Sequence, residues 1–92
     1  MLFYHGSSTI EKGEHKLLPP IITGILQEKS RKKNLNKVFF TPDIKTANIY
    51  AGRSKNQNGG TKRIFRVIPM SEITRINDLT YCSEWAFIEE IK

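Results

Sequence analysis

Residues 63–69 (RIFRVIP) limit the possible folds of this chain more than any other segment. Basic and apolar side chains alternate along most of it, as they do in a β-strand that is buried on one face and exposed on the other. A half-buried strand is stable only beside other strands, so the segment predicts a β-sheet. The alternation places Arg63, Phe65 and Val67 on one face of the strand and Ile64, Arg66 and Ile68 on the other.

The remaining segments predict a mixture of short strands and short helices. Turn residues bound several short apolar runs, and two other segments carry the signals of helix ends. We expect an α+β fold of four or five short strands, two short helices and long loops in a single domain, residues 1–92. The expected elements are strands over residues 2–5, 38–41, 63–69 and 83–91, helices over 21–29 and 43–52, a loop or short strand over 71–78, and loops over 30–37 and 53–62.

The second predicted helix has the clearest boundary signals. Thr41 and Pro42 are suited to its N-cap and first position, and Gly52 to its C-terminal end. Residues at helical spacing give it one apolar stripe. The residues of this stripe are Ile44, Ala47 or Asn48, and Ala51.

Length and composition restrict the class of protein. A chain of 92 residues is one small domain, and such a domain buries roughly 60% of the surface that its unfolded chain exposes. Hydrophobic residues make up 38% of the chain and charged residues 26%, which is typical of a soluble globular protein. No apolar run approaches the ~18 residues of a membrane span, and no secretory signal is evident. Cys82 is the only cysteine, which excludes an internal disulfide. We expect a cytoplasmic monomer.

Charge is distributed unevenly along the chain. Residues 1–28 carry two lysines and three glutamates, whereas residues 29–66 carry eleven lysines or arginines and a single acidic residue, Asp43. Residues 67–92 carry two basic and five acidic residues, so acidic ends flank a middle with a net charge of +10. A nucleic acid, a dinucleotide or an acidic protein is the natural partner of such a field. Loops kept in water by long basic side chains are an equally ordinary explanation.

Several kinds of site are excluded by the residues present. His5, His15 and Cys82 lack the spacing of zinc ligands, so we expect no metal site. The chain has no P-loop, no G-x-G-x-x-G and no G-x-S-x-G motif. Polar residues do follow or precede the predicted strands, where small sheet domains gather their sites. These residues are His5, Gly6, Thr41 and Glu84.

Four segments, in this order, resemble motifs of the ADP-ribosyltransferase superfamily. The chain looks closest to the small bacterial enzymes that ADP-ribosylate rifamycin antibiotics. Their opening strand and His-Gly-Thr motif resemble FYHGSSTIEKGEHKLLPP, and their basic loop, second motif strand and helix resemble SRKKNLNKVFFTPDIKTANIYA. Their Gly-Arg-Ile-Tyr-Arg-Val-x-Pro strand resembles GGTKRIFRVIP. Their C-terminal strand, and the glutamate strand of the poly-ADP-ribosylating branch, resemble CSEWAFIEEI. The resemblance covers nearly the whole chain and implies a split β-sheet core.

The resemblance implies NAD as co-substrate and a role for each matching residue. His5 matches the histidine that binds the adenosine ribose, and Gly6 the glycine whose backbone holds the nicotinamide amide. Phe39 matches the tyrosine that packs on nicotinamide, and Tyr50 a second aromatic that sandwiches the same ring. Glu84 matches the glutamate that binds the 2′-hydroxyl of the nicotinamide ribose and stabilises positive charge as the glycosidic bond breaks. Ser7, Thr41 and Arg31 complete the expected NAD-binding set, with Arg31 suited to neutralising the pyrophosphate.

The acid has a second candidate. In the rifamycin enzymes it lies earlier, after the Arg-Val-x-Pro strand, where this chain has Asp78 at a slightly shifted position. Glu84 is preferred because it lies in the matching strand context. The leading hypothesis is therefore a mono-ADP-ribosyltransferase whose acceptor, a small molecule, a protein or a nucleic acid, is not identified by the sequence.

Two other functions remain open. Phe39 lacks the phenolic hydroxyl of the usual tyrosine, and the chain is shorter than most of the enzymes that it resembles. Both features fit a catalytically inactive protein of this fold that binds an NAD-derived nucleotide or a protein partner. The basic middle of the chain instead favours a small nucleic-acid-binding protein. Either function suits a compact accessory protein of a phage or a bacterium.

Overall fold

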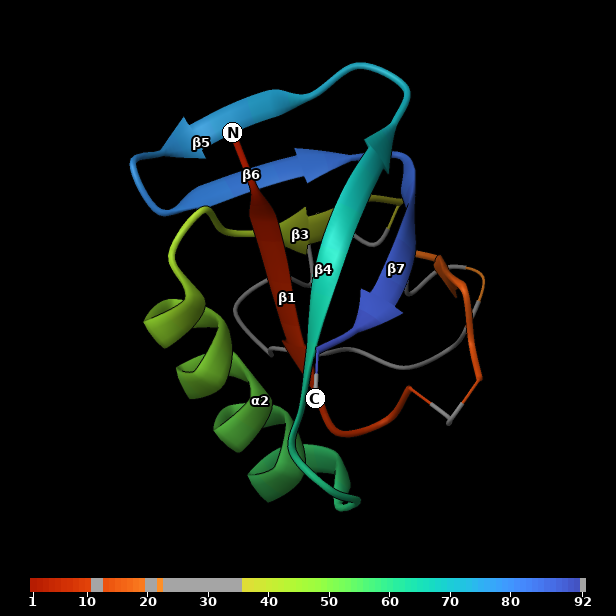
Figure 1. The fold of residues 1–92 in the computed structure, drawn as a ribbon, viewed down its shortest axis with the longest axis vertical. Helices are drawn as coiled ribbons and strands as arrows, with labels where there is room; N and C mark the ends of the chain where they lie inside the picture. The colour runs from red at the N-terminus through yellow and green to blue at the C-terminus, as the bar shows by residue number, and fades with distance from the viewer. Residues whose placement is uncertain (11–12, 20–21, 23–35, 92) are drawn as a thin grey trace.

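The structure is a computed structural model that describes residues 1–10, 13–19, 22 and 36–91. Along these residues three strands precede one helix and four strands follow it, so the fold is α+β, as expected (Figure 1). The predicted helix over 21–29 and most of the predicted loop over 30–37 lie outside the described residues. The elements are β1 (Phe3–Ser7), β2 (Lys16–Leu17), β3 (Val38–Phe40), α2 (Ile44–Asn58), β4 (Arg63–Met70), β5 (Thr74–Asn77), β6 (Thr80–Ser83) and β7 (Trp85–Glu90).

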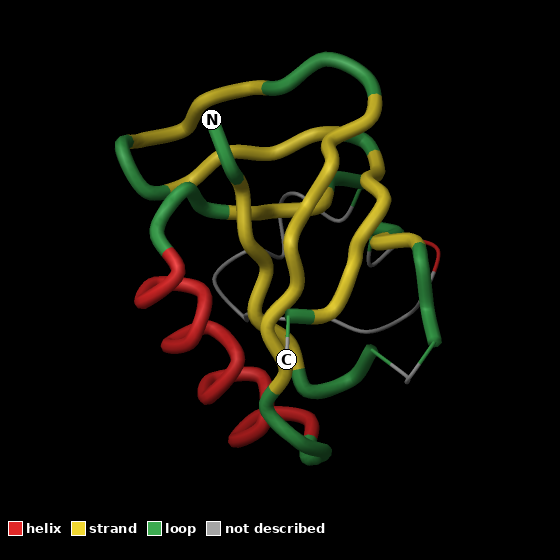
Figure 2. The backbone as a smooth tube through the Cα atoms, viewed as in Figure 1, coloured by secondary structure: helices red, strands yellow, loops and turns green. Residues whose placement is uncertain are grey.

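The strands form two antiparallel sheets. One has the order β1-β4-β7-β2 and the other the order β3-β6-β5. Figure 2 shows the strands of the smaller sheet running across one end of the larger sheet. A backbone bridge joins β1 to the end of β3: Tyr4 N–H donates to Thr41 O at 2.7 Å, and Thr41 N–H donates to Tyr4 O at 2.9 Å. The N-terminal strand therefore belongs to one sheet and is tied to the other.

The core lies between the two sheets and follows the alternation in β4. Phe3 pairs with Val67 and His5 pairs with Phe65, so these four side chains share the inner face of the larger sheet. The predicted half-buried strand over 63–69 is confirmed, with Phe65 and Val67 inside and Arg66 and Ile68 exposed. The buried hydrophobic cluster consists of Phe3, Leu17, Val38, Phe40, Phe65, Val67, Ala86 and Ile88.

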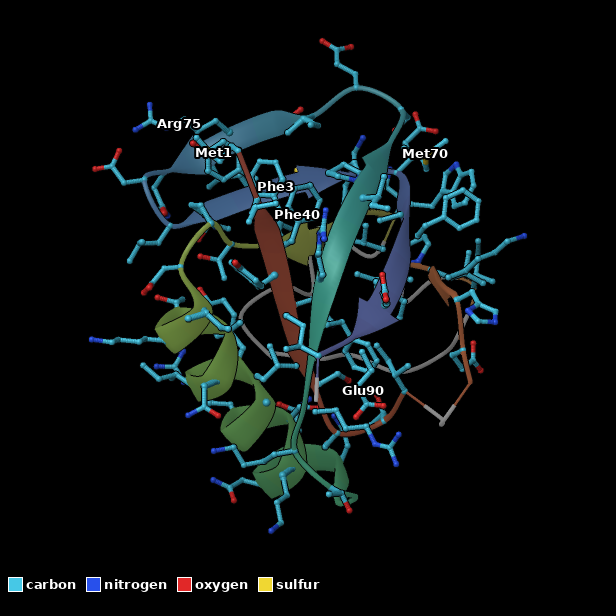
Figure 3. All side chains as sticks on the ribbon, in the orientation of Figure 1. Met1, Phe3, Phe40, Met70, Arg75 and Glu90 are labelled. Atoms are coloured by element: carbon cyan, nitrogen blue, oxygen red, sulfur yellow. The ribbon has the colours of Figure 1, made fainter. Side chains whose placement is uncertain are left out.

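Aromatic side chains fill the place where the sheets meet. The Phe3 and Phe40 rings are 4.8 Å apart at 67°, an edge-to-face contact, and the Phe3 and Tyr81 rings are 5.0 Å apart (Figure 3). Burying a phenylalanine contributes on the order of 2–3 kcal/mol. The predicted short strand over 38–41 is therefore confirmed as a buried strand, β3, although it ends at Phe40.

Helix α2 begins one residue after the start of the predicted range, 43–52, and ends six residues later than predicted. Thr41 is not its N-cap, because the Thr41 backbone is paired with Tyr4. The N-cap is Asp43, whose carboxylate accepts hydrogen bonds from Thr46 N–H at 3.2 Å and from the Thr46 hydroxyl at 2.6 Å. The predicted apolar stripe of this helix was also partly wrong. Ala47, Ala51 and Ser54 are buried, whereas Ile44 is 45% exposed.

The C-terminal end of α2 lies at Gly59, so the predicted loop over 53–62 is a loop only after Asn58. Gly59 has a φ of 79°, and its N–H donates to Lys55 O at 2.8 Å. Gly52 lies within the helix because Ser54, one turn after Ala51, is buried against β1. The Ser54 and Ser8 hydroxyls are 2.9 Å apart. A tertiary contact therefore overrides the local signal of the glycine.

The predicted last strand over 83–91 is wrong at its start. Ser83 ends β6, where it pairs with Val38, and Trp85 begins β7, where it pairs with Met70. Glu84 is thus the single residue between two strands of different sheets. The segment over 71–78, expected as a loop or short strand, contains β5. Within the described residues, no helix is long and apolar enough to cross a membrane.

Candidate active site

The predicted NAD-binding residues of the first two motifs meet where β1 lies beside β3; His5, Gly6, Phe39 and Thr41 are called the β1–β3 junction. His5 is 6% exposed, and its Nδ1 lies 2.7 Å from the carbonyl oxygen of Phe39. Because a carbonyl only accepts, Nδ1 carries the hydrogen, and Nε2 is an acceptor in the neutral ring. This hydrogen bond fixes both the orientation and the tautomer of His5.

Gly6 and Ser7 have structural contacts within the chain. A Cβ on Gly6 would lie 1.7 Å from the carbonyl oxygen of Ala47, so α2 packs directly on the β1 backbone at this point. Ser7 is fully buried, and its hydroxyl accepts a hydrogen bond from Thr9 N–H at 3.2 Å. The absence of a side chain at residue 6 is thus explained by helix packing.

Phe39 and Thr41 lie on either side of the core residue Phe40. Side chains alternate along β3, so the half-buried Phe39 shares a face with its partner Cys82, away from the Phe3–Phe40 contact. Thr41 is completely buried, and its hydroxyl accepts from Asp43 N–H at 3.2 Å. Thr41 thereby connects β3 to the start of α2.

Tyr50 lies on α2 and is half-buried. The Arg53 guanidinium lies over its ring, 5.8 Å from the centroid. The helix packs against Gly6, and alternation along β1 places the His5 side chain on the other face of that strand. The structure therefore puts α2 and the His5 ring on opposite faces of β1 rather than on the same face.

Glu84 lies at the bend between β6 and β7; Ser71, Glu84 and Trp85 are called the Glu84 corner. The Glu84 side chain is exposed, and its N–H donates to the Ser71 hydroxyl at 3.2 Å. Ser71 has a φ of 69°, a backbone conformation that residues other than glycine rarely adopt. A backbone held in this region is a feature that recurs near functional residues.

Asp78 lies at the other end of β6, in the turn after β5. The four residues of β6 span about 13 Å at 3.3 Å per residue, so Asp78 and Glu84 lie at separate places. Asp78 is 87% exposed and forms an ion pair with Arg75. Its position is that of an ordinary charged turn residue, whereas Glu84 lies two residues beyond the partner of Phe39.

A pocket opens beside Glu84. It has a volume of about 540 Å³, and its walls include Leu18, Pro19 and Trp85. Three polar side chains also line it: Lys16, Asn36 and Glu84. None of the described residues that line it belongs to the β1–β3 junction. The structure therefore brings the predicted residues together in two neighbouring groups, His5 with Phe39 and Glu84 with Trp85.

No sequence motif points to Lys16, Asn36, Ser71 or Trp85. The Lys16 ammonium lies 5.7 Å from the centroid of the Trp85 ring because β2 pairs with β7. A two-residue strand such as β2 has no local sequence signal. The one usable signal was Trp85 itself, the single tryptophan, which directly follows the candidate acid.

The charged form of the Asp43 carboxyl is stabilised at the start of α2. The hydrogen bond from the Thr46 hydroxyl holds the pKa of the Asp43 carboxyl below its ordinary value of 3.8. Arg31, the expected pyrophosphate ligand, lies outside the described residues. Within residues 1–10, 13–19, 22 and 36–91, no three His, Cys, Asp or Glu side chains are grouped as metal ligands.

Comparisons of the chain with protein-family models, with curated proteins and with solved structures found no match.

Proposed function

We propose that the protein is a mono-ADP-ribosyltransferase, which transfers ADP-ribose from NAD to an acceptor and releases nicotinamide. The proposal rests on the resemblance of the four sequence segments and on the way in which the fold arranges them. In this proposal NAD is a co-substrate, the core is an ADP-ribosyltransferase-like split sheet, and the enzyme works in the cytoplasm.

The observation that carries the proposal is the 2.7 Å contact between His5 Nδ1 and the Phe39 carbonyl oxygen. Two motifs that are 34 residues apart in the chain meet in this hydrogen bond. The third motif lies beside the second, because Phe39 pairs with Cys82 two residues before Glu84. Strands β1, β3 and β6 are thus consecutive neighbours, which supports a function that draws on residues of all three strands.

The residues fit parts of a dinucleotide in different degrees. The His5 ring is held in one orientation by the Phe39 carbonyl, as a residue that orients a ribose would be, and Phe39 is half-buried, as a stacking residue would be. The hydroxyls of Ser7 and Thr41 bind neighbouring backbone N–H groups, so they act in positioning the strand ends. The Glu84 carboxylate is exposed, and the backbone N–H of Glu84 is held by a hydrogen bond to the Ser71 hydroxyl.

The chemistry assigned to Glu84 is electrostatic. The bond between ribose C1′ and the nicotinamide nitrogen breaks with its electron pair on the nitrogen, so nicotinamide leaves as a neutral molecule. Positive charge develops on the ribose ring, and a fixed carboxylate is most effective where charge appears in the transition state. The nucleophile of the acceptor then forms the new bond to C1′ and loses its proton to water.

The test is nicotinamide release from NAD by the purified protein, with small molecules, proteins and nucleic acids offered as acceptors. Glu84→Gln should reduce the rate at least 100-fold, since one electrostatic group is commonly worth 10²–10³. Glu89→Gln, an equivalent change at an exposed carboxylate on β7, should leave it unchanged. No release by the wild-type protein, equal release by Glu84→Gln, or loss of activity in Asp78→Asn alone would contradict the proposal.

A second candidate function is binding of an NAD-derived nucleotide without turnover. Two observations favour it: His5 is only 6% exposed, and Phe39 has no hydroxyl. Calorimetry with NAD and ADP-ribose separates the two functions, because this candidate requires binding of one of them together with an absence of nicotinamide release. Binding of neither compound would remove this candidate.

A further inference from the structure

The pocket at the Glu84 corner has the size and the wall chemistry of a small-molecule site. Its volume of about 540 Å³ lies within the range of roughly 300–1,000 Å³ that is usual for such sites. Apolar walls and a few polar groups that fix the orientation of a ligand are the common pattern. Leu18 and Pro19 supply part of the apolar wall, and Lys16, Asn36 and Glu84 supply the polar groups.

Trp85 gives this pocket a flat aromatic wall. The ring is half-buried and meets the Phe87 ring edge-to-face, with the centroids 4.8 Å apart at 70°. Its backbone is paired with Met70 within the larger sheet. A tryptophan supported in this way is a rigid stacking surface for a planar ligand, and every nucleobase has a face that can stack on it.

The polar side chains fit the other parts of a nucleotide. The Lys16 ammonium lies over the Trp85 ring, 5.7 Å from its centroid, so a base stacked on that face would displace it towards the phosphate, for which it is a suitable point charge. The Asn36 amide has both a donor and an acceptor, as recognition of a base edge requires. Glu84 carries the opposite charge to Lys16, so the described lining residues together are close to neutral and would not attract a simple inorganic anion strongly.

The net charge of the chain as a whole favours a ligand that carries phosphate. The whole chain has a net charge of +6, and Asn36 lies at the described end of the basic middle segment, next to Lys37. Between residues 36 and 66 there are seven lysines or arginines and one acidic residue. Such a field raises the local concentration of polyanions and speeds their association.

We propose that this pocket binds the base and phosphate of a nucleotide, stacked on Trp85. On the basis of the function proposed above, the nucleotide is the acceptor of ADP-ribose and lies next to Glu84. The same chemistry is offered by a free mononucleotide and by an unpaired nucleotide of a single-stranded nucleic acid. The proposal separates the acceptor pocket from the β1–β3 junction, to which NAD is assigned.

The test uses Trp85 as its own reporter, because it is the only tryptophan in the chain. The tryptophan fluorescence is followed during titration with UMP and with a 12-nucleotide single-stranded DNA, in the absence of NAD. We expect saturable quenching with both ligands or with one of them. The ratio of the two affinities then identifies the source: a free nucleotide if UMP binds as tightly as the DNA, a nucleic acid if the DNA binds much more tightly.

Three substitutions locate the binding. Lys16→Gln should weaken UMP binding about tenfold through the lost charge-assisted contact, and Asn36→Ala should weaken it several-fold. Lys45→Gln makes the same charge change on α2 and should alter the affinity less than twofold. Trp85→Ala, followed by calorimetry or by the anisotropy of labelled DNA, should weaken binding at least fivefold. Circular dichroism of each variant checks that the fold is retained.

Three results would overturn the proposal: no quenching by either ligand at millimolar concentration, equal weakening by Lys16→Gln and Lys45→Gln, or competition between NAD and UMP in the Glu84→Gln variant. The last result would assign the pocket to NAD. The outcome is independent of the function proposed above. Nucleotide binding without nicotinamide release would support the nucleotide pocket and contradict the proposed enzyme activity. Nicotinamide release without nucleotide binding would support the enzyme activity and contradict the nucleotide pocket.

Discussion

The β1–β3 junction and the Glu84 corner differ in almost every physical respect. At the junction, His5, Gly6 and Thr41 are buried, and their polar groups or backbones contact other parts of the chain. At the corner, Glu84 is exposed and adjoins a pocket, and its neighbour Ser71 has a left-handed backbone. The junction therefore holds two sheets and a helix together, whereas the corner presents functional groups to solvent.

This difference changes the interpretation of the opening His-Gly pair. From the sequence it looked like a ligand-binding strand end, and the structure adds a structural reason for both residues. Substitutions at the junction will therefore lower stability whether or not NAD binds there. Substitutions at the corner should change function with little effect on folding, so the corner provides the cleaner functional experiments.

The largest loss of stability is expected for Gly6→Ala. The added Cβ would lie 1.7 Å from the Ala47 carbonyl oxygen, so α2 would have to move away from β1. We expect a loss of about 3 kcal/mol or more in the free energy of unfolding, measured by urea denaturation. Gly52→Ala is the matched control, because its Cβ would meet only the Lys62 side chain at 3.8 Å. It should be neutral or stabilising, and an equal loss in both variants would contradict the packing described here.

His5→Ala should have the next largest effect. It removes the hydrogen bond to the Phe39 carbonyl and leaves a cavity between the sheets. A loss of about 2–3 kcal/mol is expected from these two causes together. Chemical denaturation measures it, with His15→Ala, at an exposed residue, as the control. A variant as stable as the wild type would show that the junction is not the structural joint that its geometry indicates.

Asp43→Ala should cause a smaller loss that depends on pH. The Thr46 hydrogen bonds hold the pKa of the folded carboxyl below 3.8, so the native state favours the charged form. The stabilisation is therefore fully present above about pH 4 and is lost as the pH falls through the folded pKa. Melting curves at pH 7 and pH 3 should show a difference between wild type and variant that shrinks at the lower pH. A difference that does not depend on pH would exclude this N-cap role.

The smallest effect is expected at Ser71, in the corner. Ser71→Ala removes the hydrogen bond to the exposed backbone of Glu84 while keeping the strained φ of 69°, and we expect a loss of about 0.5–1 kcal/mol. Ser71→Gly removes the same bond but relieves the strain, so its stability should stay within about 0.5 kcal/mol of the wild type. Thermal melts of the two variants provide the comparison. A less stable Ser71→Gly would mean that the backbone is not strained there.

The fold was predictable where the sequence pattern is local. The alternation of residues 63–69 identified β4 and its buried face, and the short run of residues 38–41 identified β3. The end of α2 was not predictable from Gly52, because Ser54 is held by Ser8, which lies 46 residues away. The division of residues 80–90 between two sheets was also hidden, since a single exposed residue separates the strands.

The candidate site was predictable only as a set of strand ends. The neighbouring positions of His5 and Phe39 followed from the resemblance, and the register of β3 with β6 places Glu84 two residues after the partner of Phe39. The pocket could not be predicted, because Lys16 reaches Trp85 only through a two-residue pairing of β2 with β7. Residues that are distant in sequence and carry no periodicity leave no signal for such a contact.

The pairing of β1 with β4 has a consequence for how the chain acquires its fold. Phe3 pairs with Val67, which in turn pairs with Ile88. The larger sheet therefore depends on pairings between segments far apart in the sequence, and closing such long loops slows folding. Until β4 has formed, the apolar strand β1 lacks its partner in this sheet, and an unpaired apolar strand is prone to aggregation.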